Sequence, residues 1–120
     1  MTNIRLQIGQ IGELAARRHL EDSGYEITAI NYRCKLGEID IVARDGSSVV
    51  IVEVRTKTSS ACGAPEESIT AEKARRLRKL ALFYLQSVYN REAACRIDLI
   101  AIMLDRKDLS VKYLRHIKSI

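Results

Sequence analysis

Two carboxylates lie among aliphatic residues in the most strand-like part of this 120-residue chain. Asp40 and Glu53 stand between Ile and Val residues in the segment GEIDIVARDGSSVVIVEVRTK, which covers positions 37–57. Because burying an unpaired carboxylate is costly, we expect each side chain to have a partner. Oxygen ligands favour a hard cation such as Mg²⁺ or Mn²⁺ over zinc. The alternative is a structural ion pair with Arg55 or Lys57.

The loop between the two strands decides whether the carboxylates meet. A two-residue loop at Asp45-Gly46 brings Glu38 opposite Glu53 and leaves Asp40 diagonal to Glu53. A four-residue loop places Asp40 directly opposite Glu53. An odd loop without a bulge sends the carboxylates to opposite faces, which excludes a shared cation.

A hard cation held by carboxylates is typical of metal-assisted phosphodiester hydrolysis. A basic side chain beside it stabilises the charge of the transition state. Arg55 can supply that charge but cannot be a general base, because its pKa exceeds about 12. Lys57 follows on the same face of the strand and can take a lysine's role, and Glu38 is a supporting carboxylate.

Apolar residues at helical spacing predict two amphipathic helices. The first covers residues 8–22 and is stopped by Ser23-Gly24. The second begins after Thr70 as N-cap and runs to about Tyr89. Between them, the small and polar residues 58–68 predict a mobile loop. The apolar stripe predicted for the second helix is Ala74, Leu77, Ala81, Tyr84 and Val88.

Strand-favouring residues predict the rest of the fold. The predicted strands cover residues 25–34, 38–44, 48–57, 95–104 and 111–114. The first three are consecutive and antiparallel, the fourth is buried and the last is a short edge strand. The order α-β-β-β-α-β-β predicts one α/β domain over residues 1–120, a mixed β-sheet flanked by two helices.

The chain is basic, with a net charge of +5 and a pI near 9.3, which favours a polyanionic partner such as nucleic acid. Cys34, Cys62 and Cys95 are odd in number and lack CxxC spacing, so we expect reduced thiols rather than disulfides or a zinc site. We expect no export signal and no membrane span. These features favour a cytoplasmic protein.

Basic residues gather at the start of the second helix, where they form a solvated face or contact phosphates. The candidate nucleic-acid-binding residues are Arg33, Lys73, Arg75, Arg76, Arg78 and Lys79. The few aromatic residues are not interleaved with them, which argues against base stacking. His19 and His116 form no ligand pair and adjoin no Ser or Cys signature, so we interpret both as surface or core residues.

Asp40 followed by Glu53-Val54-Arg55 resembles the PD-(D/E)XK nuclease motif, with Arg in place of the usual Lys and Ile39 in place of Pro. Over nearly its full length, the chain resembles the YraN family of predicted bacterial nucleases related to archaeal Holliday-junction resolvases. The matching stretches are residues 9–13, 31–33, 37–40, 52–57 and 96–99. The resemblance implies a restriction-endonuclease-like fold, a homodimer, and Glu13 as a further acidic member of the site.

The leading hypothesis is a Mg²⁺- or Mn²⁺-dependent endonuclease that hydrolyses phosphodiester bonds in DNA, including branched DNA. Asp40 and Glu53 hold the metal, Glu13 completes the acidic shell or positions water, and Arg55 or Lys57 stabilises the phosphate. A second hypothesis is a non-catalytic nucleic-acid-binding module whose nuclease site has lapsed. A third is a structural domain in which the acidic residues make only ion pairs.

Overall fold

The computed structural model describes residues 3–59, 63–88 and 93–120. Its helices and strands are α1 (Ile4–Asp22), β1 (Glu26–Cys34), β2 (Gly37–Asp45), β3 (Ser48–Lys57), α2 (Ala71–Val88), β4 (Cys95–Leu104) and β5 (Val111–Ile117). This confirms the predicted order α-β-β-β-α-β-β. A 3₁₀ helix, η1 (Pro65–Ser68), lies within the predicted loop, of which residues 60–62 are outside the described part.

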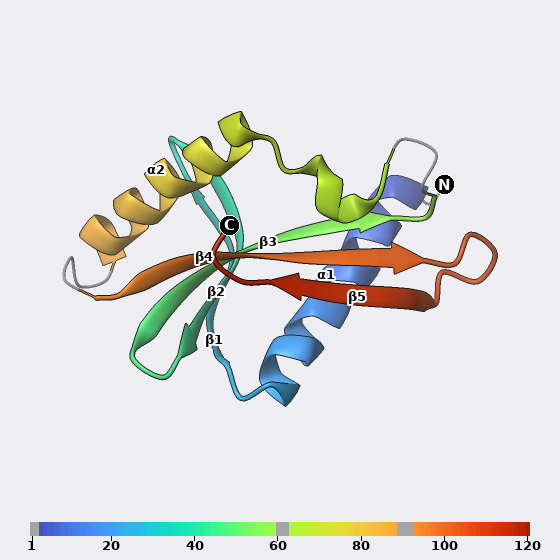
Figure 1. Ribbon diagram of the computed structural model, residues 1–120, viewed down its shortest axis with the longest axis horizontal. Helices are drawn as coiled ribbons and strands as arrows, with labels where there is room; N and C mark the ends of the chain where they lie inside the picture. Colours follow the sequence, from blue (N-terminus) through green and yellow to red (C-terminus); the bar gives the residue numbers. More distant parts are fainter. Residues whose placement is uncertain (1–2, 60–62, 89–92) are drawn as a thin grey trace.

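The strands form one sheet in the order β1-β2-β3-β4-β5. Neighbouring strands are antiparallel except β3 and β4, which are parallel and joined through α2. Figure 1 shows α2 over one side of this sheet and α1 crossing the other. The mixed sheet with its two helices is consistent with the restriction-endonuclease-like fold that the resemblance implies.

Each face of the sheet carries its own hydrophobic core. Ala16 and Leu20 of α1 pack on Val50 and Val52 of β3, whereas Leu77, Leu80, Ala81, Tyr84 and Leu85 of α2 pack on the opposite face. Because both faces are covered, β4 is an almost continuous run of buried residues. Val88, predicted as part of the stripe on α2, is 56% exposed.

The start of α1 and the end of β5 differ from the prediction. α1 begins at Ile4 rather than residue 8, because Asn3 Oδ1 accepts hydrogen bonds from the N–H groups of Arg5 and Leu6. β5 continues to Ile117. The Thr70 cap of α2 is confirmed by the Lys73 N–H, which donates to Thr70 Oγ1 at 3.1 Å. Tyr89, the predicted end of this helix, lies outside the described residues.

The turn between β2 and β3 consists of Gly46 and Ser47 rather than Asp45 and Gly46. Asp45 pairs with Ser48, and Gly46 supplies the positive φ, 61°, that a two-residue hairpin turn requires. The resulting register is the one expected from a four-residue loop. Its continuation places Asp40 directly opposite Glu53.

Two further features bear on the predictions about membrane spans and cysteines. No helix among the described residues is long and apolar enough to cross a membrane. Cys34 and Cys95 are free thiols, and Cys62 is outside the described part.

Candidate active site at the fork between two strands

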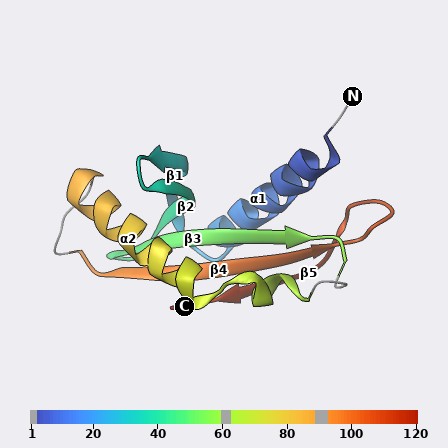
Figure 2. The ribbon, with the colours of Figure 1, turned by 90° about the horizontal axis from the view of Figure 1, so that it is seen from above.

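Strands β2 and β3 separate at the position of the two carboxylates. The β2–β3 ladder ends at the pair Ile41–Val52, but β3 stays paired with β4 as far as Lys57. Figure 2 shows the β1–β2 hairpin leaving the plane of β3 and β4. Asp40 and Glu53 are the first residues past the last pair, so they flank the fork.

The Asp40 side chain takes the place of the backbone acceptor that the Val54 N–H would have if the β2–β3 ladder continued. Its Oδ2 accepts a hydrogen bond of 2.8 Å from the Val54 N–H, where the β2–β3 ladder no longer continues. A buried backbone N–H needs such a partner. The bond fixes the Asp40 carboxylate inside the fork.

Glu53 is the most perturbed carboxylate beside the fork. Its side chain is 12% exposed and forms an ion pair of 2.6 Å with Arg55. Burial and the neighbouring Asp40 raise the pKa of Glu53 to about 7, although Arg55 and Lys73 oppose this rise. Because two neighbouring carboxylates repel each other, the pair favours a shared proton or a bound cation.

Glu13 approaches Asp40 from the side of α1. The preceding residue, Gly12, is buried against β3, and a Cβ at this position would lie 1.9 Å from Thr56 Oγ1. This close approach holds α1 on the strand. Burial and the charge of Asp40 raise the pKa of Glu13, whereas a side-chain hydrogen bond with Asn31 lowers it. Asp40 is therefore the common neighbour of Glu13 and Glu53.

The basic candidates on β3 have defined partners. Besides its ion pair with Glu53, Arg55 has a buried Nε with no hydrogen-bond partner among the described residues. Lys57 Nζ donates to the Gly63 carbonyl at 3.4 Å. Glu38 lies 3.6 Å from Arg33 and is 40% exposed, so it belongs to the rim of the site.

A groove of about 970 Å³ runs from the start of α1 across the fork to the end of β3. Asp40 and Glu13 line it together with Arg5, Arg33, Arg55 and Lys57. Glu53 is not among its lining residues. The groove brings together two carboxylates, Glu13 and Asp40, and several basic side chains.

The donor set fits a Mg²⁺- or Mn²⁺-type cation better than a fully protein-coordinated metal. No group of three His, Cys, Asp or Glu side chains within the described ranges could hold a metal ion. Mg²⁺ needs only one or two carboxylates, since it keeps several waters that substrate phosphates replace. Asp40 and Glu53, adjacent and oxygen-only, meet that requirement.

The profile of the uncharacterised protein family UPF0102 matches residues 12–102, which contain the whole fork. The chain belongs to the UPF0102 family. It is 51% identical over 108 residues to a UPF0102 protein of Moorella thermoacetica, with 90% of each chain covered. It is 43% identical to a UPF0102 protein of Pelotomaculum thermopropionicum, covering 99% of this chain and 98% of the relative. The YraN-like resemblance is thus confirmed at the level of the family.

The basic residues on α2 of this UPF0102 protein lie apart from the groove. Lys73 is close enough to Glu53 to lower its pKa. The other four are exposed and none of them lines the groove. They are Arg75, Arg76, Arg78 and Lys79. Arg33 is the predicted phosphate-binding residue that the structure places at the groove.

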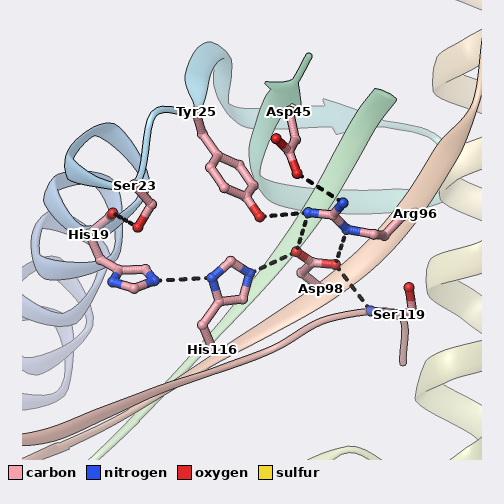
Figure 3. A network of polar contacts seen from close by, with 8 residues as sticks. All are labelled: His19, Ser23, Tyr25, Asp45, Arg96, Asp98, His116 and Ser119. Carbon is pink, nitrogen blue, oxygen red and sulfur yellow. Dashed lines mark hydrogen bonds and ion pairs between the residues drawn. The ribbon is translucent and has the colours of Figure 1, made fainter. Parts of the chain in front are cut away.

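His19 and His116, interpreted from the sequence as surface or core residues, are hydrogen-bonded to each other. Figure 3 shows a polar network in which His19 Nε2 lies 3.0 Å from His116 Nδ1 and His116 Nε2 lies 2.7 Å from Asp98 Oδ2. Asp98 is fully buried and also accepts hydrogen bonds from Arg96 and the Ser119 N–H. Burial alone would raise the pKa of Asp98, but these hydrogen bonds lower it.

This network ties distant parts of the UPF0102 fold together. Arg96 also contacts Asp45 at the end of β2 at 3.1 Å and the Tyr25 hydroxyl at 2.6 Å. In the sequence, the only sign of this network is a single carboxylate, Asp98, inside the aliphatic run CRIDLIAIML. The partners outside β4 come from five places, which are α1, the residue before β1, the end of β2, β5 and the segment after β5, so spacing along the chain does not reveal them.

Proposed function

We propose that this protein is a divalent-cation-dependent endonuclease that hydrolyses phosphodiester bonds in DNA. The observation that carries the proposal is the position of Asp40, fixed in the fork by the Val54 N–H and next to both Glu13 and Glu53. Neighbouring carboxylates repel each other unless a cation or proton offsets their charge. The resemblance to predicted nucleases supports the same chemistry.

Asp40 and Glu53 would hold the cation, with Glu13 facing it from α1. When bound, such a cation supplies a water of lowered pKa and offsets the negative charge that grows on the phosphate. The raised pKa of Glu13 makes its carboxylate a better proton acceptor than an ordinary glutamate at neutral pH. Glu13 thus positions the attacking water or takes its proton.

Arg55 is the protein side chain that would place a positive charge beside the reacting phosphate. Its buried Nε lacks a hydrogen-bond partner within the described residues, and Arg55 is one of the residues that line the groove. A phosphate oxygen would provide the missing acceptor. Lys57, at the same end of β3, adds a second cation for the phosphate backbone.

The composition of the groove favours phosphates over bases as the main contacts. Arg5 and Arg33 lie on its lining, and none of the described lining residues is aromatic. Salt-dependent contacts to phosphates bind nucleic acid without regard to sequence. The exposed basic face of α2 would extend such contacts beyond the groove.

A non-catalytic nucleic-acid-binding module is the second candidate. Arg55 stands where the nuclease motif has Lys, and its ion pair of 2.6 Å with Glu53 competes with a cation for the same carboxylate. If the ion pair between Arg55 and Glu53 persists, Glu53 does not bind a cation and the nuclease site is inactive. The protein would then bind DNA in a salt-dependent manner that Arg75→Ala combined with Arg78→Ala weakens, with no cleavage in any metal.

The test is cleavage of linear and branched DNA in Mg²⁺, Mn²⁺ or EDTA. We expect cleavage by the wild type with either cation, none in EDTA, and a loss of at least about a hundredfold in Asp40→Asn and Glu53→Gln. The control is Glu72→Gln, which removes a glutamate whose side chain is 78% exposed on α2. Equal activity in all four proteins would eliminate this site, and binding without cleavage would favour the second candidate.

A further inference from the structure

The two histidines of the chain, His19 and His116, form a pair outside the candidate active site. His19 lies in the last turn of α1, His116 lies on β5, and neither lines the groove. Their rings meet edge to face, with 5.1 Å between the ring centroids and 3.0 Å between His19 Nε2 and His116 Nδ1 (Figure 3). The histidine pair therefore joins the C-terminal end of the helix to a strand of the sheet.

Asp98 fixes the orientation of the His116 ring. Although burial opposes ionisation, hydrogen bonds from Arg96 and His116 lower the pKa of Asp98, so its carboxylate is charged. Asp98 Oδ2 lies 2.7 Å from His116 Nε2. Because a charged carboxylate only accepts hydrogen bonds, this ring nitrogen carries a proton. Nδ1 is then the His116 nitrogen that is left for His19.

The bond between the two rings holds a single proton. If His19 Nε2 donates this proton, both rings can be neutral, and if His116 Nδ1 donates it, His116 carries a positive charge and His19 is neutral. The bond is therefore compatible with no charge or one charge on the pair. When both rings are charged, each of the two facing nitrogens carries an N–H, and neither of them can accept. A second proton thus breaks the bond.

The surroundings of the pair oppose the second proton. Burial and the neighbouring His116 lower the pKa of His19, although the carboxylate of Asp22 on α1 opposes this. On the other side of the pair, the charge of Asp98 is shared with the Arg96 guanidinium, which lies 2.9 Å away. The titratable and charged groups that reach the pair or this carboxylate from neighbouring segments are Tyr25, Asp45, Arg96 and Asp98.

We propose that the histidine pair is a pH-sensitive contact between α1 and β5. The contact forms while the pair carries at most one positive charge and breaks when both rings are protonated. Breaking it releases the last turn of α1 from β5, while Ala16 and Leu20 keep the rest of the helix packed on the sheet. Because the broken form binds one more proton, acid favours it. The inference concerns the fold and holds whether or not the protein is a nuclease.

The first test counts the protons on the pair in the untagged, full-length wild type. NMR chemical shifts of the ring nitrogens, read through the carbon-bound ring protons, show which nitrogens are protonated, and every histidine signal belongs to the pair. We expect the Nε2–H tautomer for both rings in the neutral pair and two separate protonation steps, the second below about pH 6.5. A single step near pH 6.5 for both rings, or a neutral His116 protonated on Nδ1, would overturn the proposal.

The second test is amide hydrogen exchange of residues 19–22 at about pH 7.5 and about pH 5. Protection should fall at least about tenfold in the wild type at the lower pH and stay constant in His19→Gln, whose side-chain N–H still donates but takes up no proton. Arg18→Gln is the matched control, because it removes a positive charge from an exposed neighbour and should behave as the wild type. Equal losses of protection in the wild type and His19→Gln would overturn the proposal. If His19→Gln does not fold, the ring titration of the wild type decides.

Discussion

The Oδ2 atom of Asp40 accepts a hydrogen bond of 2.8 Å from the backbone N–H of Val54. The bond occurs where β2 leaves β3, so the carboxylate satisfies a strand N–H that the ladder no longer serves. Asp40 therefore has a structural role, and its charge raises the pKa of both Glu13 and Glu53. Substitutions that keep the hydrogen bond but remove the charge can separate the two.

Asp40→Asn and Asp40→Ala should differ in stability. The Asn carbonyl oxygen can still accept from Val54 and carries no charge, so we expect a free energy of unfolding at or above that of the wild type. Ala leaves the Val54 N–H without its partner and should cost about 1 to 3 kcal/mol. Urea unfolding in EDTA measures both. Equal stability of the two variants would show that the Val54 bond does not stabilise the fork.

Glu53 should make the metal-free protein less stable as the pH rises. Its pKa is about 7 in the folded state against an ordinary value of 4.5, so the folded state binds more protons between these values. The contribution of Glu53 to the free energy of unfolding is therefore fully present below pH 4.5 and is lost as the pH rises through about 7. From about pH 5 to pH 8, the wild type should lose about 1 to 3 kcal/mol relative to Glu53→Gln.

The measurement for Glu53 is urea unfolding in EDTA at both pH values. Glu72→Gln serves as the control, because its exposed carboxylate should leave the pH dependence unchanged. Parallel pH profiles for the wild type and Glu53→Gln would contradict the raised pKa.

Much of the fold follows from local sequence signals. Periodicity, the Thr70 cap and the Gly46 turn region indicate both α-helices and all five strands but not the 3₁₀ helix η1, because these features act over a few residues. The earlier start of α1 depends on Asn3, a cap that precedes the apolar stripe. The hairpin register depends on which residues of Asp45-Gly46-Ser47 form the turn, and these alternatives are close in sequence.

The candidate site was predictable only in part. Asp40, Glu53 and Arg55 lie within one hairpin, so their proximity follows from strand parity and register. Glu13 comes from another element and entered through resemblance alone. The pairing of His19 with His116 joins residues 97 positions apart, which no local pattern encodes.

Two glycines on α1 should respond in opposite ways to alanine. Gly12→Ala puts a Cβ 1.9 Å from Thr56 Oγ1, so we expect a loss of about 1 to 3 kcal/mol as α1 moves off β3. Gly9→Ala meets no atom within 4 Å and should gain up to about 1 kcal/mol from helix propensity. Thermal unfolding compares them. Similar effects of both substitutions would contradict the close packing at Gly12.

Asp98 and Asp45 both bind Arg96 but should contribute very differently. Asp98→Asn removes a charge from a fully buried site and leaves Arg96 without its main partner, which should cost about 3 to 5 kcal/mol. Asp45 is 43% exposed, so Asp45→Asn should cost less than about 1 kcal/mol. Denaturant unfolding at neutral pH checks this contrast. An equal loss in both variants would contradict the central place of Asp98.

The most direct measurement is anomalous scattering from crystals soaked in Mn²⁺ at about pH 8, where Glu53 is ionised. The proposed function predicts a Mn²⁺ peak at the fork, in contact with carboxylate oxygens of Asp40 and Glu53, and its loss in Asp40→Asn. Saturating Mn²⁺ that gives no peak at the fork, while Glu53 keeps its ion pair with Arg55, would contradict a cation-dependent active site.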